Sequence, residues 1–253
     1  MGEHEPGYVT WLTEHFYALT DSLGLHLTHA PLVHLWMVLF IFIFLLALFG
    51  YWSKRYQIYP SFMQQILETY FNFIRNLVED VIGPHGKEYI PLIGTLGLFI
   101  LFSNLMGLVP IFVAPTSNIN VPCACALFVF VYYHYQGIRK QGIVNYLKHF
   151  AGPVWWLAPL FIPVELIGHL ARPVSLTFRL FGNIFGEELV IAILFGLVAF
   201  IVPLPIMCLA IFTSLIQTLV FIMLSCIYIA GAVAHEEGHE EHEEEHVPEL
   251  AHA

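Results

Sequence analysis

Apolar segments long enough to cross a lipid bilayer recur along the 253-residue chain, and they restrict its fold more than any other feature. A membrane-spanning helix needs roughly 20 predominantly apolar residues. Hydrophobic residues make up 58% of the sequence and charged residues 11%, whereas about 25% of the residues of a soluble domain are charged. The sequence therefore predicts an all-α polytopic membrane protein and excludes an ordinary soluble domain.

The apolar segments predict one membrane domain, residues 31–234. We expect five transmembrane helices, a short helix and an amphipathic helix. The spans lie at about 32–52, 90–113, 121–136, 174–201 and 206–234, and the short helix at 162–170, set off by Pro173. Because the last two spans exceed one perpendicular crossing, we expect a long tilted helical hairpin. Apolar residues at helical spacing within 56–88 predict an amphipathic cytoplasmic helix outside the hydrocarbon.

Two terminal regions flank this domain. Residues 1–30 contain acidic but no basic side chains and show no cleavable signal peptide. Residues 235–253 are almost all Glu and His, too polar to bury a core, and are expected to be disordered. His–Glu clusters can bind metal, but a solvated acidic tail is the simpler interpretation. Eight of the nineteen acidic residues lie in the last eighteen positions, so the net charge of −10 describes the tail rather than a surface for a cationic partner.

The basic residues predict the orientation of the chain. Cytoplasmic loops of membrane proteins carry an excess of Lys and Arg. Seven of the nine basic residues fall in the two loops that follow the first and third spans, and none falls in residues 1–30 or 114–120. With five spans, this split predicts a periplasmic N-terminus and a cytoplasmic C-terminus.

The most apolar part of the chain carries an unusual load of charge. Residues 163–189 contain two arginines, three glutamates, a histidine and an asparagine. An ionisable group at membrane depth costs several kcal/mol, from about 2.5 upward, so the default interpretation is an ion path. Arg179 is its centre, because it cannot deprotonate and has no carboxylate three or four residues away. A permanent cation there requires an anion from another chain.

Helical spacing arranges the other polar residues around Arg179. Ser175 and Asn183 share its face, whereas Glu188 lies on the opposite face, roughly 13 Å along the axis, which suggests two separate aqueous pockets. Glu165, His169 and Arg172 form one stripe. Simpler roles remain possible for three of the charged or polar residues. Arg172 could be an interfacial side chain, His169 a structural hydrogen-bond donor and Glu187 a surface group. On the last span, Thr213, Ser214 and Gln217 form a polar patch that could face the Arg179 helix.

Residues 175–183 read Ser-Leu-Thr-Phe-Arg-Leu-Phe-Gly-Asn, followed by Glu188-Leu189. This motif resembles the signature of the a subunit of F-type ATP synthases, the membrane stator of a rotary motor. Segments 102–110, 115–120, 163–166 and 215–217 agree with the same family. The resemblance covers about residues 90–235 in order.

The resemblance implies a subunit that carries protons through two half-channels to and from a carboxylate on a ring of c subunits. Arg179 would be the essential arginine facing that ring. Glu188, with Gln217 and Asn104, would line the inlet, and Glu187 could replace Glu188 as its relay. Glu165, Ser175 and Asn183 would line the outlet, and His169 would belong to the proton pathway.

The resemblance also implies the setting of the chain. The partners would be the c-subunit ring, the b-subunit peripheral stalk, the F1 sector indirectly and the lipid bilayer, without nucleic acid. The chain would be non-catalytic by itself, would use no cofactor or metal, and would lie in the bacterial inner membrane.

Two positions depart from the family pattern, and two other functions compete. Ala210 stands where some members have a histidine, and Gly107 where some relatives are acidic. A self-contained secondary transporter is disfavoured by the five spans and the lack of an internal repeat. An intramembrane enzyme or metal transporter built on His169 and Glu165 would need further His or Cys ligands to converge on them, and we expect His134 and His149 in or near a loop.

Overall fold

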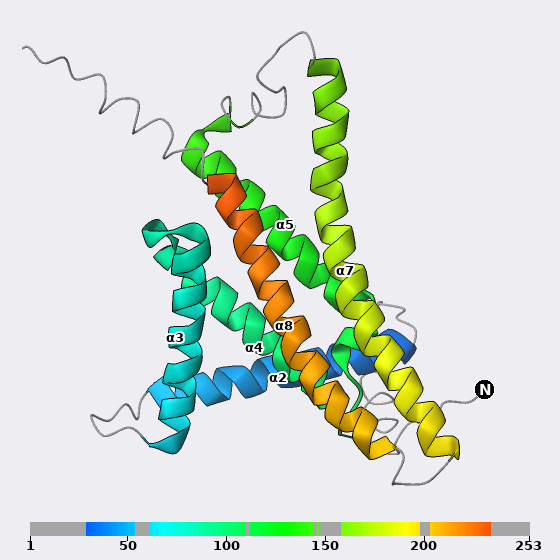
Figure 1. Cartoon of the computed structure of the whole chain (residues 1–253). Helices are drawn as coiled ribbons and strands as arrows, with labels where there is room; N and C mark the ends of the chain where they lie inside the picture. Colours follow the sequence, from blue (N-terminus) through cyan, green and yellow to red (C-terminus); the bar gives the residue numbers. More distant parts are fainter. Residues whose placement is uncertain are drawn as a thin grey trace, which may run out of the picture.

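The structure is a computed structural model that describes residues 29–53, 61–109, 112–143, 146, 158–197 and 203–233 (Figure 1). These residues are helical throughout apart from short connections, and no strand occurs among them, which confirms the all-α prediction. The α-helices are α2 (His29–Ser53), α3 (Phe62–Ile82), α4 (Ile90–Met106), α5 (Asn120–Gln141), α7 (Ala158–Leu197) and α8 (Pro203–Val233). Two 3-10 helices, η1 (Pro84–Tyr89) and η2 (Pro115–Ser117), lie in the connections. The segments 1–28 and 234–253, with the predictions made for them, lie outside the described residues.

Four of the described helical segments are long and apolar enough to cross a membrane. They are Val33–Tyr51, Gly86–Met106, Asn120–Gln141 and Leu204–Val233, and they correspond to four of the five predicted spans. The fifth predicted span lies in α7, whose apolar sequence is interrupted by five charged side chains.

The predicted break before Pro173 is wrong. In place of a short helix at 162–170 followed by a separate span, α7 runs unbroken for 40 residues with Pro163 and Pro173 inside it. A proline removes one backbone hydrogen bond, but in a membrane the remaining helical bonds have no competing water, so such helices tolerate it. The Thr177 hydroxyl donates a 2.7 Å hydrogen bond to the Pro173 carbonyl in this turn.

The amphipathic helix predicted within 56–88 is α3. Ile74 and Val78, one turn apart, are fully buried against the bundle, while Arg75 and Glu79 form a 2.9 Å ion pair on the exposed side. The helix ends at Gly83, whose φ of 92° favours glycine and whose N–H donates a hydrogen bond to the Glu79 carbonyl. The Gly-Pro sequence at 83–84 therefore ends α3.

The core of the molecule lies where α4, α5, α7 and α8 meet, with α3 packed on one side. In Figure 1, α7 and α8 run side by side near the connection that joins them, and α5 lies against both. The buried side chains come from every one of these helices: Ile93 and Ile100 of α4, Val129 and Tyr133 of α5, Leu176, Leu180 and Ile184 of α7, and Phe221 and Ile229 of α8. One face of α7 is thereby fixed against the bundle.

The first span packs through a single narrow stripe. Val33, Met37, Ile41 and Leu45 of α2, spaced four residues apart, are buried and form a cluster with Leu98 and Met106 of α4. Most of the other large apolar side chains of α2 are exposed, while Trp36, Leu48 and Phe49 are half-buried, as expected of a helix that faces lipid on most of its surface. This geometry makes α2 a peripheral helix of the bundle.

Candidate functional site

Arg179 lies on the outer face of α7. Its neighbours Leu176 and Leu180 are buried in the core, and the helical turn therefore directs Arg179 away from the rest of the chain, where it is exposed. No carboxylate among the described residues forms an ion pair with it. The predicted isolation of this cation within its own chain is confirmed for the described residues.

Small residues accompany Arg179 along this face. Gly168, Ser175, Gly182 and Gly186 fall within the same stripe at about 100° per residue, and the stripe covers roughly 27 Å of the axis from Gly168 to Gly186. A Cβ added at any of the three glycines would meet no atom of the described structure within 4 Å. The face is therefore thin and open, and another helix could approach its backbone closely.

Glu188 lies on the other side of α7, as the nine-residue separation predicts. Its Oε1 accepts a 3.1 Å hydrogen bond from the Ala114 backbone N–H, in the connection between α4 and α5. Gly107 makes this approach possible, because a Cβ there would lie 2.7 Å from the Ala114 Cβ and 2.9 Å from Glu188 Oε1. The glycine that departs from the family pattern thus leaves room for a glutamate of α7.

A residue of the same connection also forms a hydrogen bond with Asn104 of α4. Thr116, in η2, donates a 2.8 Å hydrogen bond to Asn104 Oδ1, and both side chains are buried. Asn104 Nδ2 and the neighbouring Ser103 Oγ are buried without a hydrogen-bond partner among the described residues. Glu188 and Asn104, predicted to share a path, therefore both form hydrogen bonds with the segment 114–116.

The polar patch of α8 faces α7 across the hairpin, as predicted. The Thr213 hydroxyl lies 3.1 and 3.2 Å from the two carboxylate oxygens of Glu187. Asn183 Nδ2 donates a 2.8 Å hydrogen bond to Gln217 Oε1, although the family resemblance assigns these two residues to different half-channels. Gln217 is buried, and its Nε2 has no hydrogen-bond partner among the described residues.

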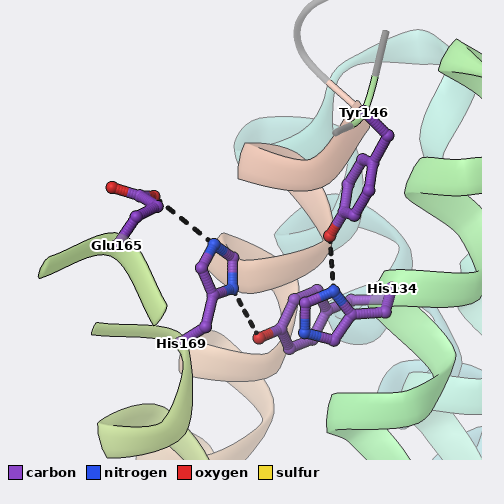
Figure 2. A network of polar contacts seen from close by, with 5 residues as sticks. His134, Tyr146, Glu165 and His169 are labelled. Atoms are coloured by element: carbon purple, nitrogen blue, oxygen red, sulfur yellow. Dashed lines mark hydrogen bonds and ion pairs between the residues drawn. The ribbon is translucent and has the colours of Figure 1, made fainter. Parts of the chain in front are cut away.

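A second polar cluster lies toward the other end of α7 (Figure 2). Glu165 Oε1 is 3.4 Å from His169 Nε2, which confirms the predicted stripe. The Tyr133 hydroxyl and His169 Nδ1 share a 3.0 Å hydrogen bond across α5 and α7. His134, the next residue of α5, forms a hydrogen bond through its Nδ1 with the Tyr146 hydroxyl.

Arg172 and a small cavity complete this second cluster. The Arg172 guanidinium lies over the rings of Tyr133 and Tyr228, at 6.0 and 5.3 Å from their centroids. A cavity of about 60 Å³ beside it is lined by Gln141, Tyr146, Glu165, His169, Arg172, Gly231 and Ala232. Within the described part of the chain, no three His, Cys, Asp or Glu side chains are arranged to hold a metal ion.

Sequence reasoning missed the residues that reach these sites from other helices. The expected position of His134 in or near a loop is wrong, because His134 lies within α5. Tyr133 and His134 reach the Glu165 stripe through the packing of α5 against α7, and Tyr146, in the segment after α5, contacts His134. Thr116 lies in the segment 115–120, whose agreement with the family motif was the one available signal. The Ala114 N–H could not be identified from the sequence, because every residue except proline has a backbone N–H.

Comparison with known proteins identifies the family. The sequence model described as "ATP synthase A chain" matches residues 32–230. A protein named "ATP synthase subunit a 1" from Syntrophotalea carbinolica is 44% identical over 233 residues, which cover 89% of this chain and 96% of the relative. "ATP synthase subunit a" of Desulfosudis oleivorans is 48% identical over 224 residues, 87% of this chain and 96% of the relative.

A shorter alignment agrees with these two. "ATP synthase subunit a" of Geobacter sulfurreducens is 48% identical over 181 residues, which cover 72% of this chain and 79% of the relative. The family motif, the all-helical bundle and the isolated arginine on α7 all agree with this assignment. The chain therefore belongs to the ATP synthase A chain family, the multi-pass membrane subunit a of F-type ATP synthases.

Proposed function

We propose that this chain carries protons to and from a ring of c subunits through two half-channels that meet at Arg179. The observation that carries the proposal is the position of Arg179, exposed on the open face of α7 and without a carboxylate partner among the described residues. A carboxylate on a ring helix would supply the missing anion. The glycines at 182 and 186 would allow that helix to approach α7 closely.

In this proposal, Arg179 has two roles. It attracts the deprotonated ring carboxylate as the ring turns, and its permanent charge prevents protons from passing directly between the two half-channels. Because a guanidinium holds its proton at any accessible pH, it acts through charge alone and never as a proton carrier. The chain itself would be non-catalytic, and ATP chemistry would belong to the F1 sector.

The inlet half-channel would be lined by Glu188, Glu187, Asn104 and Gln217. The hydrogen bonds of Glu188 and Asn104 to the segment 114–116 support a common path at this end of the bundle. The unpaired buried amide nitrogens of Asn104 and Gln217 support a hydrated path, because buried polar groups ordinarily bind a protein group or water. The Thr213 hydroxyl beside Glu187 replaces part of the polar surface that a histidine at Ala210 would supply.

The outlet half-channel would begin near Ser175 and Asn183 and would continue past His169 to Glu165. Glu165 and Arg179 are roughly 21 Å apart along the axis of α7, which is enough to reach from mid-membrane to the end of a span. The hydrogen bond between Asn183 and Gln217 would join the walls of the two paths beside Arg179. The cavity at Glu165 supports an opening at this end.

The basic loops support the orientation. Arg139 and Lys140 in the last turn of α5 would be cytoplasmic, which places the start of α7 and the end of α8 on the cytoplasmic side. The N-terminus would be periplasmic, and the membrane would be the bacterial inner membrane. The b-subunit stalk would contact the exposed surface of α2 or α3, because both helices carry large apolar side chains that no described residue covers.

The decisive test is ATP-driven proton pumping by the whole complex in inverted membrane vesicles. We expect Arg179→Ala to assemble and to lose both pumping and ATP synthesis. The exposed Phe178 provides a matched control, because Phe178→Leu changes the adjacent side chain without removing charge and should pump. Normal pumping by the Arg179→Ala complex would contradict the proposal and would direct attention to Glu165 and His169.

A further inference from the structure

We propose that His134 is a proton carrier of the outlet half-channel and that it forms one proton-holding unit with His169. This inference rests on the proposed function and extends it to α5, a helix to which the family motif assigns no proton carrier in this chain. Figure 2 shows the two imidazoles side by side, with Glu165 on one side and Tyr146 on the other. Their ring centroids are 5.1 Å apart.

The hydrogen bonds of the two histidines suit proton transfer. Each Nδ1 contacts a tyrosine hydroxyl, Tyr133 for His169 and Tyr146 for His134. A hydroxyl both donates and accepts a hydrogen bond, so it remains a partner to imidazole in either protonation state. The second nitrogen of His169 faces Glu165. A proton can therefore bind one nitrogen of an imidazole and leave from the other, without any change in oxidation state.

The location of the unit fits the last part of the outlet. His169 lies ten residues before Arg179, roughly 15 Å along α7, and Glu165 lies one turn farther toward the end of the helix. The cavity of about 60 Å³ touches Tyr146, Glu165 and His169. It exceeds the roughly 10–15 Å³ that one water requires, and its walls offer polar partners. A proton released by Glu165 therefore has a polar space to enter.

Charge limits the unit to about one proton at a time. The titratable and charged groups that face the imidazoles come from every element packed around them: Tyr133 of α5, Tyr146 of the following segment, Glu165 and Arg172 of α7, and Tyr228 of α8. Two protonated imidazoles at this separation beside the Arg172 guanidinium would repel one another, so the pair titrates as a coupled unit. Single occupancy favours release of each proton before the next arrives.

If this cluster served only to pack α5 against α7, it would not need ionisable side chains. Burying polar and ionisable groups at the contact of membrane helices is costly, and apolar side chains would pack α5 against α7 without that cost. The cluster instead combines two imidazoles, a carboxylate, a guanidinium and tyrosine hydroxyls. These are groups that bind, pass or repel protons.

The test compares the parent complex with His134→Gln in inverted vesicles, where the cytoplasmic side faces the medium. ATP-driven pumping is followed while the medium is varied from about pH 6 to 8. We expect pumping to fall about tenfold, less than the roughly 10²–10⁴-fold that a positioned proton carrier can contribute, because other steps also limit the rate. The decline at high pH should begin at lower pH, since fewer groups capture protons from the medium.

Two further variants separate proton transfer from packing. In His134→Ala, imidazole added to the medium should restore part of the pumping. The double variant His134→Gln with His169→Gln should be little worse than either single variant, because both remove the same unit. Tyr135→Phe is the matched control, since Tyr135 follows His134 on α5 and is exposed, and it should retain the parent pH profile.

The outcomes distinguish this inference from the proposed function. The inference about His134 would be overturned if His134→Gln pumped at the parent rate with the parent pH profile. If Arg179→Ala did not pump in the same experiments, the proposed function would still stand. Should His134→Gln fail to assemble, Tyr146→Phe decides, because it removes only the hydroxyl partner of His134. An unchanged pH profile in Tyr146→Phe would then overturn the inference, and a shifted profile would support it.

Discussion

Glu188 of α7 and Gly107 at the end of α4 are in such close contact that the glycine position has no room for a side chain. A Cβ at Gly107 would lie 2.9 Å from Glu188 Oε1, the same atom that accepts the hydrogen bond from the Ala114 N–H. The carboxylate is therefore held by the connection between α4 and α5. Its position depends on that connection as much as on α7.

This contact predicts the effect of Gly107→Ala. The added methyl group would displace either Ala114 or Glu188, since real Cβ contacts are almost never this short. We expect a several-fold loss of ATP-driven pumping with the complex still assembled, because overpacking costs about 1–3 kcal/mol and shifts nearby side chains. Gly50→Ala in α2, where a Cβ meets no described atom within 4 Å, is the matched control. Equal pumping by both variants would show that Glu188 does not need its present position.

The open face of α7 predicts a different effect for Gly186→Leu. Within this chain a Cβ at Gly186 would meet no described atom within 4 Å, so the chain should fold normally. A ring helix would no longer approach the backbone, and we expect co-purification of the c ring and proton pumping to be lost together. Ala192 is exposed on α7 and is rotated from Gly186 by about a third of a turn around the helix axis. The Ala192→Leu variant should therefore retain both the c ring and proton pumping. Retention of the ring by Gly186→Leu would mean that the ring contacts another surface.

The proposed barrier role of Arg179 predicts the passive proton permeability of vesicles stripped of F1. Removing the guanidinium in Arg179→Ala removes the charge that separates the two half-channels. Passive proton conductance of these stripped vesicles should therefore persist or rise, although the intact Arg179→Ala complex, with F1 bound, makes no ATP. The measurement is the rate at which an imposed pH gradient decays, with the c-ring carboxylate blocked as the control. A tightly sealed membrane in Arg179→Ala would argue against a barrier made by this charge.

The hydrogen bond between Asn183 and Gln217 predicts a measurable coupling across the hairpin. A double-mutant cycle with Asn183→Ala and Gln217→Ala should give a coupling of about 0.6 kcal/mol, and at most about 1.7, as found for hydrogen bonds between membrane helices. The readout is the free energy of unfolding of the detergent-solubilised complex. The same cycle with Asn183 and Thr218, whose hydroxyl bonds to the Ser214 carbonyl of its own helix, should show little coupling. Strictly additive changes for Asn183 and Gln217 would show that their contact contributes no stability.

The sequence predicted those features that depend on spacing along one helix. The separation of Arg179 from Glu188 and the approach of Glu165 to His169 follow from 3.6 residues per turn. The apolar segments similarly located four helical segments that are long and apolar enough to cross a membrane. These relationships hold whatever the neighbouring helices do.

Contacts between side chains of different helices could not be predicted from the sequence. The contact of Tyr133 with His169 joins residues 36 positions apart, and that of Ala114 with Glu188 joins residues 74 positions apart. Both depend on crossing angles and on packing that no local pattern records. The continuity of α7 through Pro173 was missed for a related reason, because helix-breaking rules drawn from water overstate the effect of proline where water cannot replace the backbone bonds.

The unbroken 40-residue α7 has a mechanical consequence in the proposed motor. Because Arg179, Glu165 and Glu188 belong to one hydrogen-bonded rod, the distances between them are set by the helical rise and remain constant while the ring moves past. A turning ring pushes sideways on the charge that attracts its carboxylate. Leu176, Leu180 and Ile184 pack an adjoining face of this helix into the core, so this force passes into α5 and α8 rather than bending a hinge beside Arg179.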